Sequence, residues 1–309
     1  MNRPRTLPWQ LSFASLGVIW GCSFLFIKLG LQSFSPIQVG FLRLTIGAAT
    51  LLLLSRAMGV GLLRRPGSLR HLAVTGLLYC SLPGVLFAFG ETHVSSALAG
   101  IINGATPLMV LLVVLVAFPE EHPTRQRVAG LLVGFAGVLV VLGIWDGFAG
   151  GELIGVLACL AGITCYGIAF PYTRRHLVGT GDHPVAIATG QVGMGALFLL
   201  PVMLLELAAG GGRVATPIAA DTLLGIVALG SLGSGVAYAL NAQIIKAAGS
   251  TVASSVGYLS PLVAVSVGIA ILGEPIAWYE PVGALIVLTG VAIAQGRLRI
   301  PGLAPAPAA

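Results

Sequence analysis

Ten runs of predominantly apolar residues dominate this sequence, and each is long enough to cross a lipid bilayer. A transmembrane helix needs about 20 such residues, because the hydrocarbon core is about 30 Å thick and a helix rises about 1.5 Å per residue. The connections between the runs are short. The sequence therefore predicts an all-α polytopic membrane protein with ten transmembrane helices, at residues 11–30, 37–54, 72–90, 97–118, 128–144, 153–172, 185–205, 223–245, 251–272 and 277–295.

The composition indicates that lipid is the main solvent. Charged residues make up 8% of the chain and hydrophobic residues 57%, whereas a soluble domain carries about a quarter charged residues. The net charge of +6 lies in short turns rather than along one exposed face, which argues against binding of nucleic acid. The 43 glycines favour close helix contacts, which we predict at Gly17/Gly21, Gly100/Gly104 and Gly130/Gly134.

The distribution of basic residues predicts the orientation. With the N-terminus inside, both termini and the even-numbered loops hold thirteen arginines and lysines, and the odd-numbered loops hold Arg213 alone. Basic residues concentrate on the cytoplasmic side of membrane proteins. We therefore expect a multi-pass protein of the plasma (inner) membrane with cytoplasmic N- and C-termini, and with Trp145, Trp278 and Tyr279 at the outer interface.

The two halves of the chain resemble each other at a spacing of roughly 150 residues. Thr106-Pro107 corresponds to Ser260-Pro261, and Trp20 corresponds to Tyr166; in each half the proline is followed by a glutamate and then by two glycines. Because five spans per half is an odd number, the halves are predicted to be inverted repeats, which allow alternating access. We predict a cytoplasmic N-terminus at 1–10, five-helix repeats at 11–146 and 151–296, and a disordered cytoplasmic tail at 297–309.

Taken in order, these motifs resemble the drug/metabolite transporter superfamily, EamA-type. The resemblance covers residues 10–296 and rests on Trp20-Gly21, Phe41-Leu42-Arg43-Leu44, the two repeat prolines, and the Glu-then-Gly pattern that opens the fifth and tenth spans. It implies two five-helix halves around a central cavity and, for many members, export of amino acids or other small metabolites. The sequence departs from the pattern at Glu120-Glu121-His122, which is one residue longer than its counterpart at Glu274, so the equivalent glutamate is ambiguous.

Candidate substrate-binding residues lie near the two repeat prolines. A proline leaves a carbonyl one turn earlier without its helical donor, and lipid tolerates this only where neighbours or cavity water satisfy the carbonyl. We predict hinges at Pro107 and Pro261. The polar residues predicted to face the substrate beside them, with hydrogen bonding between helices as the alternative, are Asn103, Thr106, Tyr258 and Ser260.

Other residues inside the spans are predicted to line the same cavity. A charged residue within a span usually faces protein or water, and the planar guanidinium of Arg43 suits a substrate carboxylate. Snorkelling to the outer interface is the alternative for Arg43 and for Lys28. The remaining candidates, for which packing is the alternative, are Trp20, Tyr166, Gln191, Tyr238 and Asn241.

The acidic residues are predicted to serve structure rather than ion coupling. Glu120, Glu121 and Glu274 precede helices and are expected to cap them. Glu91 and Glu206 fall at the edges of spans, and no Asp or Glu falls deep within one. Since ion-coupled carriers often use a buried carboxylate, we expect facilitated diffusion or exchange.

The sequence contains no P-loop, HExxH or GxSxG motif, so we expect no catalytic activity, metal or cofactor. The predicted function is a secondary transporter that moves small metabolites across the plasma membrane by alternating access, above all by exporting amino acids or related compounds. The expected partners are a small-molecule substrate and the lipid bilayer, and the oligomeric state is open. The alternatives are a multidrug exporter and a non-transporting membrane receptor or assembly subunit.

Overall fold

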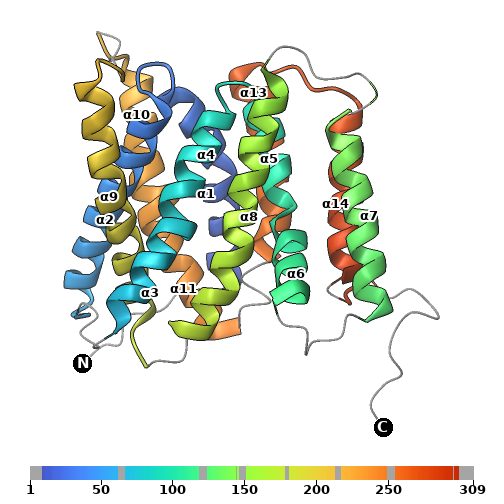
Figure 1. Ribbon diagram of the computed structural model, residues 1–309, viewed down its shortest axis with the longest axis horizontal. Coiled ribbons are helices and arrows are strands. Elements are labelled where there is room, and N and C mark those ends of the chain that lie inside the picture. Colours follow the sequence, from blue (N-terminus) through green and yellow to red (C-terminus); the bar gives the residue numbers. More distant parts are fainter. Residues whose placement is uncertain are drawn as a thin grey trace.

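The computed structural model describes residues 9–61, 67–117, 124–143, 145, 151–177, 181–212, 217–248, 255–294 and 296–298. Within these residues the chain forms ten helical segments, which we number in chain order and which run side by side in Figure 1. Segments one, two, five, six and seven are single helices: α1 (Trp9–Gly30), α2 (Pro36–Ala57), α7 (Arg125–Val141), α8 (Glu152–His176) and α9 (Pro184–Ala208).

The other segments are mostly composite. Segment three is α3 (Ser68–Thr75), η1 (Gly76–Ser81) and α4 (Leu82–Gly90), and segment four is α5 (Ser96–Gly104) and α6 (Thr106–Ala117). Segment eight is α10 (Ala220–Ala228), η2 (Leu229–Val236) and α11 (Ala237–Ala248). Segment nine is η3 (Ser255–Tyr258) and α13 (Leu259–Leu272), and segment ten is α14 (Tyr279–Ala294).

These segments correspond to the ten predicted spans, with ends that differ by a few residues. Seven of them are long and apolar enough to cross a membrane, and α13 and α14 are shorter apolar helices. Parts of the predicted spans lie outside the described residues, at 118, 144, 251–254 and 295. So do the predicted tail from 299 onward and the glutamates Glu120 and Glu121.

Local sequence fixes where several helices begin. Ser35 accepts a hydrogen bond from the backbone N–H of Gln38, whose side chain accepts from the Ser35 N–H, so the two form a capping box at the start of α2. Pro36 occupies the first turn of this helix, where its missing N–H costs nothing. Ser95 and Thr124 cap α5 and α7, because the hydroxyl of each accepts a hydrogen bond from the backbone N–H three residues later.

Segments three and eight each contain a π-helical stretch, η1 and η2. Stretches of π-helix are rare and often mark functional sites. Segment eight occupies in the second half the place of segment three in the first. The two irregularities therefore stand at equivalent positions in the two halves of the chain.

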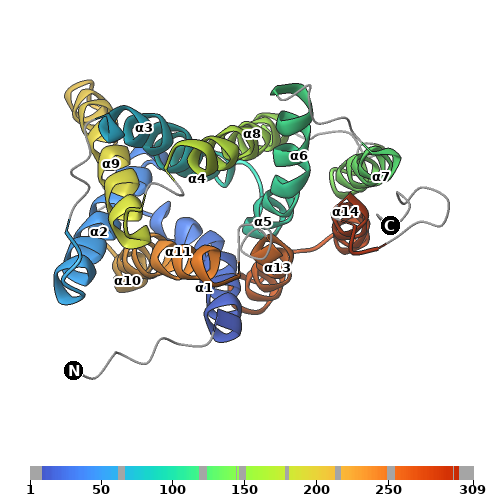
Figure 2. The ribbon, with the colours of Figure 1, turned by 90° about the horizontal axis from the view of Figure 1, so that it is seen from below.

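The largest contacts between segments are preserved when five is added to or subtracted from each segment number. α1 packs on α13 as α8 packs on α6, α2 packs on η2 as α9 packs on η1, and α1 packs on α11 as α8 packs on α4. The contacts α2–α9 and α7–α14 each join a segment to its own counterpart in the other half, so exchanging the halves leaves them the same. Figure 2 shows α1, α11 and α13 along one side, α4, α8 and α6 along the other, and the α7–α14 pair at one end.

Glycines bring the backbones of neighbouring segments together, as predicted. A β-carbon on Gly130 would lie 2.4 Å from Ala294 N, and one on Gly137 would lie 2.5 Å from Val287 N. The α7–α14 contact therefore joins two backbones, and the pairing order makes the two helices antiparallel. The other predicted pairs also face neighbouring helices, with Gly17 and Gly21 against α13 and Gly100 and Gly104 against α13.

Candidate functional site

The helix breaks of segments four and nine cross at the two predicted hinges. α5 ends at Gly104 before α6 begins, and η3 gives way to α13 at Leu259. A β-carbon on Gly104 would lie 2.5 Å from Pro261 Cγ, and one on Gly257 would lie 3.7 Å from Pro107 Cγ. Each proline thus packs against a glycine just before the other proline, and the structure brings Pro107 and Pro261 together.

Thr106 has a structural task at this crossing. Its hydroxyl donates to Asn103 O at 2.7 Å, the carbonyl four residues before Pro107 that the proline deprives of a donor. Asn103 itself is half-buried. The counterpart hydroxyl of Ser260 is buried and has no hydrogen-bond partner among the described residues. Ser260 therefore keeps unused hydrogen-bonding capacity beside the hinge.

A central aromatic cluster lies between the two sides of the bundle; we define it as Trp20, Tyr79, Tyr166 and Tyr238. The ring centroids are 6.5 Å apart for Trp20 and Tyr238, 5.2 Å for Tyr238 and Tyr79, and 5.6 Å for Tyr79 and Tyr166. In order of contact, Trp20 belongs to segment one, Tyr238 to segment eight, Tyr79 to segment three and Tyr166 to segment six. Exchanging the two halves of the protein therefore gives the same series of contacts in reverse, with Trp20 and Tyr166 at its two ends.

Arg43 points into the protein rather than toward the outer interface. Its side chain is only 9% exposed, and its Nε donates to Ser234 Oγ of η2 at 2.9 Å. It lies close enough to Tyr166 and Tyr238 to interact with both electrostatically. The alternative of snorkelling is thus wrong for Arg43. Its guanidinium group is buried beside the aromatic cluster.

The remaining predicted residues lie around this centre to different degrees. Asn241 is buried on α11, about one turn after Tyr238. Gln191 is buried at the contact between α8 and α9, where its Nε2 donates to Thr173 Oγ1 at 3.3 Å. Tyr258 ends η3, but its side chain lies outside the described part of the chain.

Tyr79 is the central residue that the sequence reasoning missed. It lies in η1, is buried, and contacts the rings of Tyr166, Phe170 and Tyr238. Its hydroxyl has no hydrogen-bond partner within the described residues. An alignment of segments three and eight, extending the repeat already seen in other segments, would have pointed to it as the counterpart of Tyr238.

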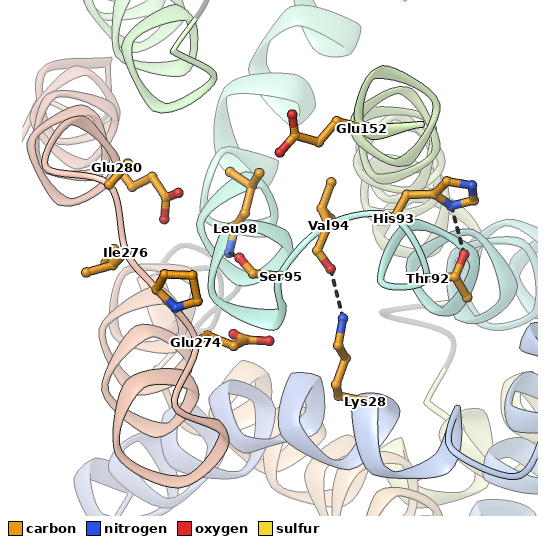
Figure 3. A pocket seen from close by; sticks show the side chains of 12 residues that line it. Lys28, Thr92, His93, Val94, Ser95, Leu98, Glu152, Glu274, Ile276 and Glu280 are labelled. Atoms are coloured by element: carbon orange, nitrogen blue, oxygen red, sulfur yellow. Dashed lines mark hydrogen bonds between the residues drawn. The ribbon is translucent and has the colours of Figure 1, made fainter. Parts of the chain in front are cut away.

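A second feature is a cavity of about 590 Å³ at the end of the bundle where segments one and three finish. Figure 3 shows its lining, in which Lys28 points toward the Val94 carbonyl and three acidic side chains, Glu152, Glu274 and Glu280, lie at separate places around the pocket. Lys28 Nζ donates to the backbone oxygens of Glu91 at 2.8 Å and Val94 at 3.1 Å. We call this cavity the outer pocket, because it lies at the predicted outer face.

Glu274 caps a helix, but not the one that the sequence predicts. Its Oε1 accepts from Ser96 N at 2.9 Å, and its Oε2 accepts from Ser96 Oγ at 2.8 Å and from Ala97 N at 3.1 Å. These donors belong to the first turn of α5, whereas Glu274 itself precedes α14. The carboxylate is attracted by the positive end of the α5 dipole, so Glu274 ties segment nine to segment four.

Glu91 also departs from expectation. It follows the last residue of α4 and so stands at the edge of a span, as predicted, yet its side chain is 0% exposed. Neither carboxylate oxygen has a hydrogen-bond partner among the residues that the structure describes. The premise that the protein lacks a buried carboxyl group is therefore wrong. A residue at the end of a span can be buried by neighbouring helices, whose positions the sequence alone does not give.

Comparison with known proteins gives a consistent result. The sequence matches the model of the EamA-like transporter family twice, at residues 7–143 and 153–295. It is 26% identical over 311 residues to the uncharacterized inner membrane transporter YedA of Escherichia coli (strain K12), covering 97% of this chain and 95% of that protein. It is 27% identical over 298 residues to the uncharacterized transporter YcxC of Bacillus subtilis (strain 168), covering 94% of each.

The fold is shared with a protein of known crystal structure. That protein is 21% identical, and it superposes with a TM-score of 0.65 over 93% of this chain and 96% of that chain.

Proposed function

Because this chain belongs to the EamA-like transporter family and is a multi-pass membrane protein, we propose that it is a secondary transporter that moves small metabolites by alternating access. In this proposal residues 11–146 and 151–296 are inverted five-helix repeats around a central substrate site. The observation that carries it is the exchange symmetry of the packing, with the aromatic cluster at its centre. The antiparallel course of α7 and α14, which are equivalent helices, supports the inversion.

Exchange symmetry gives the bundle a physical route to two states. Each half can take up the packing of the other, which closes one end of the bundle and opens the opposite end. Glu274 supports this reading, because it joins segments nine and four at the predicted outer face. The hinges at Pro107 and Pro261 lie where those same two segments cross, so movement there would change the separation of their ends.

The substrate class is proposed from the groups at the centre. The guanidinium of Arg43 would bind a carboxylate, amide and hydroxyl groups at Asn103, Asn241 and Ser260 would accept or donate hydrogen bonds, and the rings would cover an apolar side chain. Amino acids and related metabolites combine these features. The distribution of basic residues orients the protein in the plasma membrane, and we propose export across it because the family resemblance implies export of such compounds for many members.

A multidrug exporter is the second candidate, and the four contacting rings favour it. Aromatic faces attract organic cations, and Tyr79 and Tyr238 are buried at the centre. The buried guanidinium of Arg43 weighs against this candidate, because it repels cations from the same region.

Transport by purified protein in liposomes tests the proposal. A panel of labelled amino acids and labelled aromatic cations would be offered to the native protein and to Asn103→Ala and Tyr166→Ala. Tyr172→Ala is the matched control, since Tyr172 lies on the same helix as Tyr166 but pairs with His71.

We expect saturable transport of one or more amino acids, reduced about tenfold or more in Asn103→Ala and Tyr166→Ala and retained in Tyr172→Ala. A tenfold loss corresponds to about 1.4 kcal/mol. Transport of aromatic cations alone would support the multidrug exporter. Absence of transport for the whole panel by well-folded protein would contradict an amino-acid carrier.

A further inference from the structure

Glu91 is the most unusual ionisable group in the described part of the chain. It is wholly buried, and neither of its carboxylate oxygens has a hydrogen-bond partner among the described residues. Buried acids are normally paired or hydrogen-bonded, because an isolated buried charge costs so much that the group gives up its charge instead. The geometry alone therefore indicates a carboxyl group that is neutral in this conformation.

The charged and titratable groups facing Glu91 come from four elements. Lys28 approaches from α1, Arg43 from α2, Cys159 from α8, and Glu274 from the connection after α13. Burial raises the pKa of the Glu91 carboxyl well above its ordinary value, and Lys28 opposes this to a smaller extent. Glu91 itself lies outside the helices that it connects, directly after Gly90.

Lys28 is placed to change partners. In this conformation its ammonium group donates to the backbone carbonyls of Glu91 and Val94 rather than to the Glu91 carboxylate. Lys28 also lines the outer pocket, as do Thr92 and His93, the two residues that follow Glu91 (Figure 3). Lys28 therefore contacts both the backbone of Glu91 and the outer pocket.

We propose that Glu91 is a proton-binding site that couples transport to a proton gradient, with Lys28 as the group that stabilises its deprotonated form. When the outer end opens, the Glu91 carboxyl loses H⁺ to water in the outer pocket. The carboxylate that remains pairs with the ammonium of Lys28, which leaves the two carbonyls. No electrons are transferred. When the outer end closes and the inner end opens, the carboxylate takes up H⁺ from water in the central site beside Arg43, which then faces the cytoplasm, and Lys28 returns to the two carbonyls, so that one proton crosses the membrane in each cycle.

This inference rests on the proposed function, because a coupling site has meaning only in a transporter. It replaces the expectation of uncoupled diffusion with a named proton carrier. Its first test, however, needs no substrate, so the two proposals can fail separately.

The first experiment measures the protonation of Glu91 directly. Infrared spectra of purified native protein, Glu91→Gln and Glu206→Gln would be recorded over a range of pH. Glu206 is the matched control, since it is a carboxylate at the predicted outer face that accepts a hydrogen bond from Ser35 Oγ at 2.8 Å. We expect native protein at neutral pH to show the C=O stretching band of a protonated carboxyl group, lost in Glu91→Gln and kept in Glu206→Gln. Identical spectra for native protein and Glu91→Gln at neutral pH would overturn the proposal.

The second experiment uses the liposomes described above, with whichever panel compound the native protein transports. We expect a pH gradient to drive accumulation by native protein and Glu206→Gln, whereas Glu91→Gln only equilibrates the compound and still exchanges labelled for unlabelled molecules. A single symmetrical elution peak for each variant establishes that it is folded. Gradient-driven accumulation by Glu91→Gln would overturn the coupling role, and lack of any transport by native protein would instead count against the proposed function.

Discussion

The α7–α14 contact makes a sharp prediction for the substitution Gly290→Ala. A β-carbon at Gly290 would lie 2.3 Å from Gly134 N and 2.7 Å from Gly130 O. These are backbone atoms, which cannot rotate away, so the helices must separate by about 1 Å to restore ordinary contact distances. Overpacking of this kind costs about 1–3 kcal/mol, while alanine regains about 0.5–1 kcal/mol of helix propensity. We expect a net loss of about 0–2.5 kcal/mol, whereas a glycine with free space around it should gain stability on the same change.

The assay is thermal unfolding in detergent, followed by tryptophan fluorescence. Gly193→Ala is the matched control, because a β-carbon at Gly193 in α9 would meet nothing within 4 Å. We expect Gly290→Ala to lower the apparent melting temperature and Gly193→Ala to leave it unchanged or raise it slightly. If Gly290→Ala were as stable as Gly193→Ala, the backbone contact between α7 and α14 would be refuted.

Three further predictions concern buried polar groups. Ser234→Ala removes the acceptor of the buried guanidinium and should cost about 1.5–3 kcal/mol in thermal unfolding, whereas Ser231→Ala, at an exposed hydrogen bond of the same π-helix, should be near neutral. Tyr79→Phe removes a hydroxyl that has no partner among the described residues and should change stability little, whereas Tyr238→Phe loses its donor to Tyr79 O and should cost about 0.5–1.5 kcal/mol. Because burial raises the pKa of Glu91, its contribution to stability is full below the ordinary pKa of glutamic acid and is lost as the pH rises through the folded-state pKa. As the pH is raised, the melting temperature should therefore fall less steeply in Glu91→Gln than in the native protein. Equal slopes for the two proteins would contradict this.

The helical segments could be predicted because lipid imposes one simple requirement on the sequence. Each segment must satisfy its own backbone hydrogen bonds across about 20 apolar residues, and the sequence alone carries that signal. The breaks near Pro107 and Pro261 were predictable for the same reason, since proline removes a specific hydrogen bond. The packing of glycine against neighbouring helices also follows from spacing alone.

The π-helices and the glutamate contacts could not be predicted, because they depend on neighbours in space. Nothing in the local sequence distinguishes η1 from an α-helical turn, so the alignment of Tyr79 with Tyr238 was not evident. Glu274 caps α5, which lies far away in sequence, rather than the helix that follows it. Glu91 is buried by segments whose placement composition does not reveal.

Substrate counterflow in liposomes is the most direct test of a carrier with one centrally located site. Liposomes would be loaded with an unlabelled compound that the native protein transports, diluted into a trace of the labelled compound, and followed over time. Alternating access predicts a transient accumulation of label above its outside concentration, abolished in Tyr166→Ala and retained in Tyr172→Ala. A monotonic approach to equilibrium without any overshoot would contradict alternating access and would indicate a channel instead.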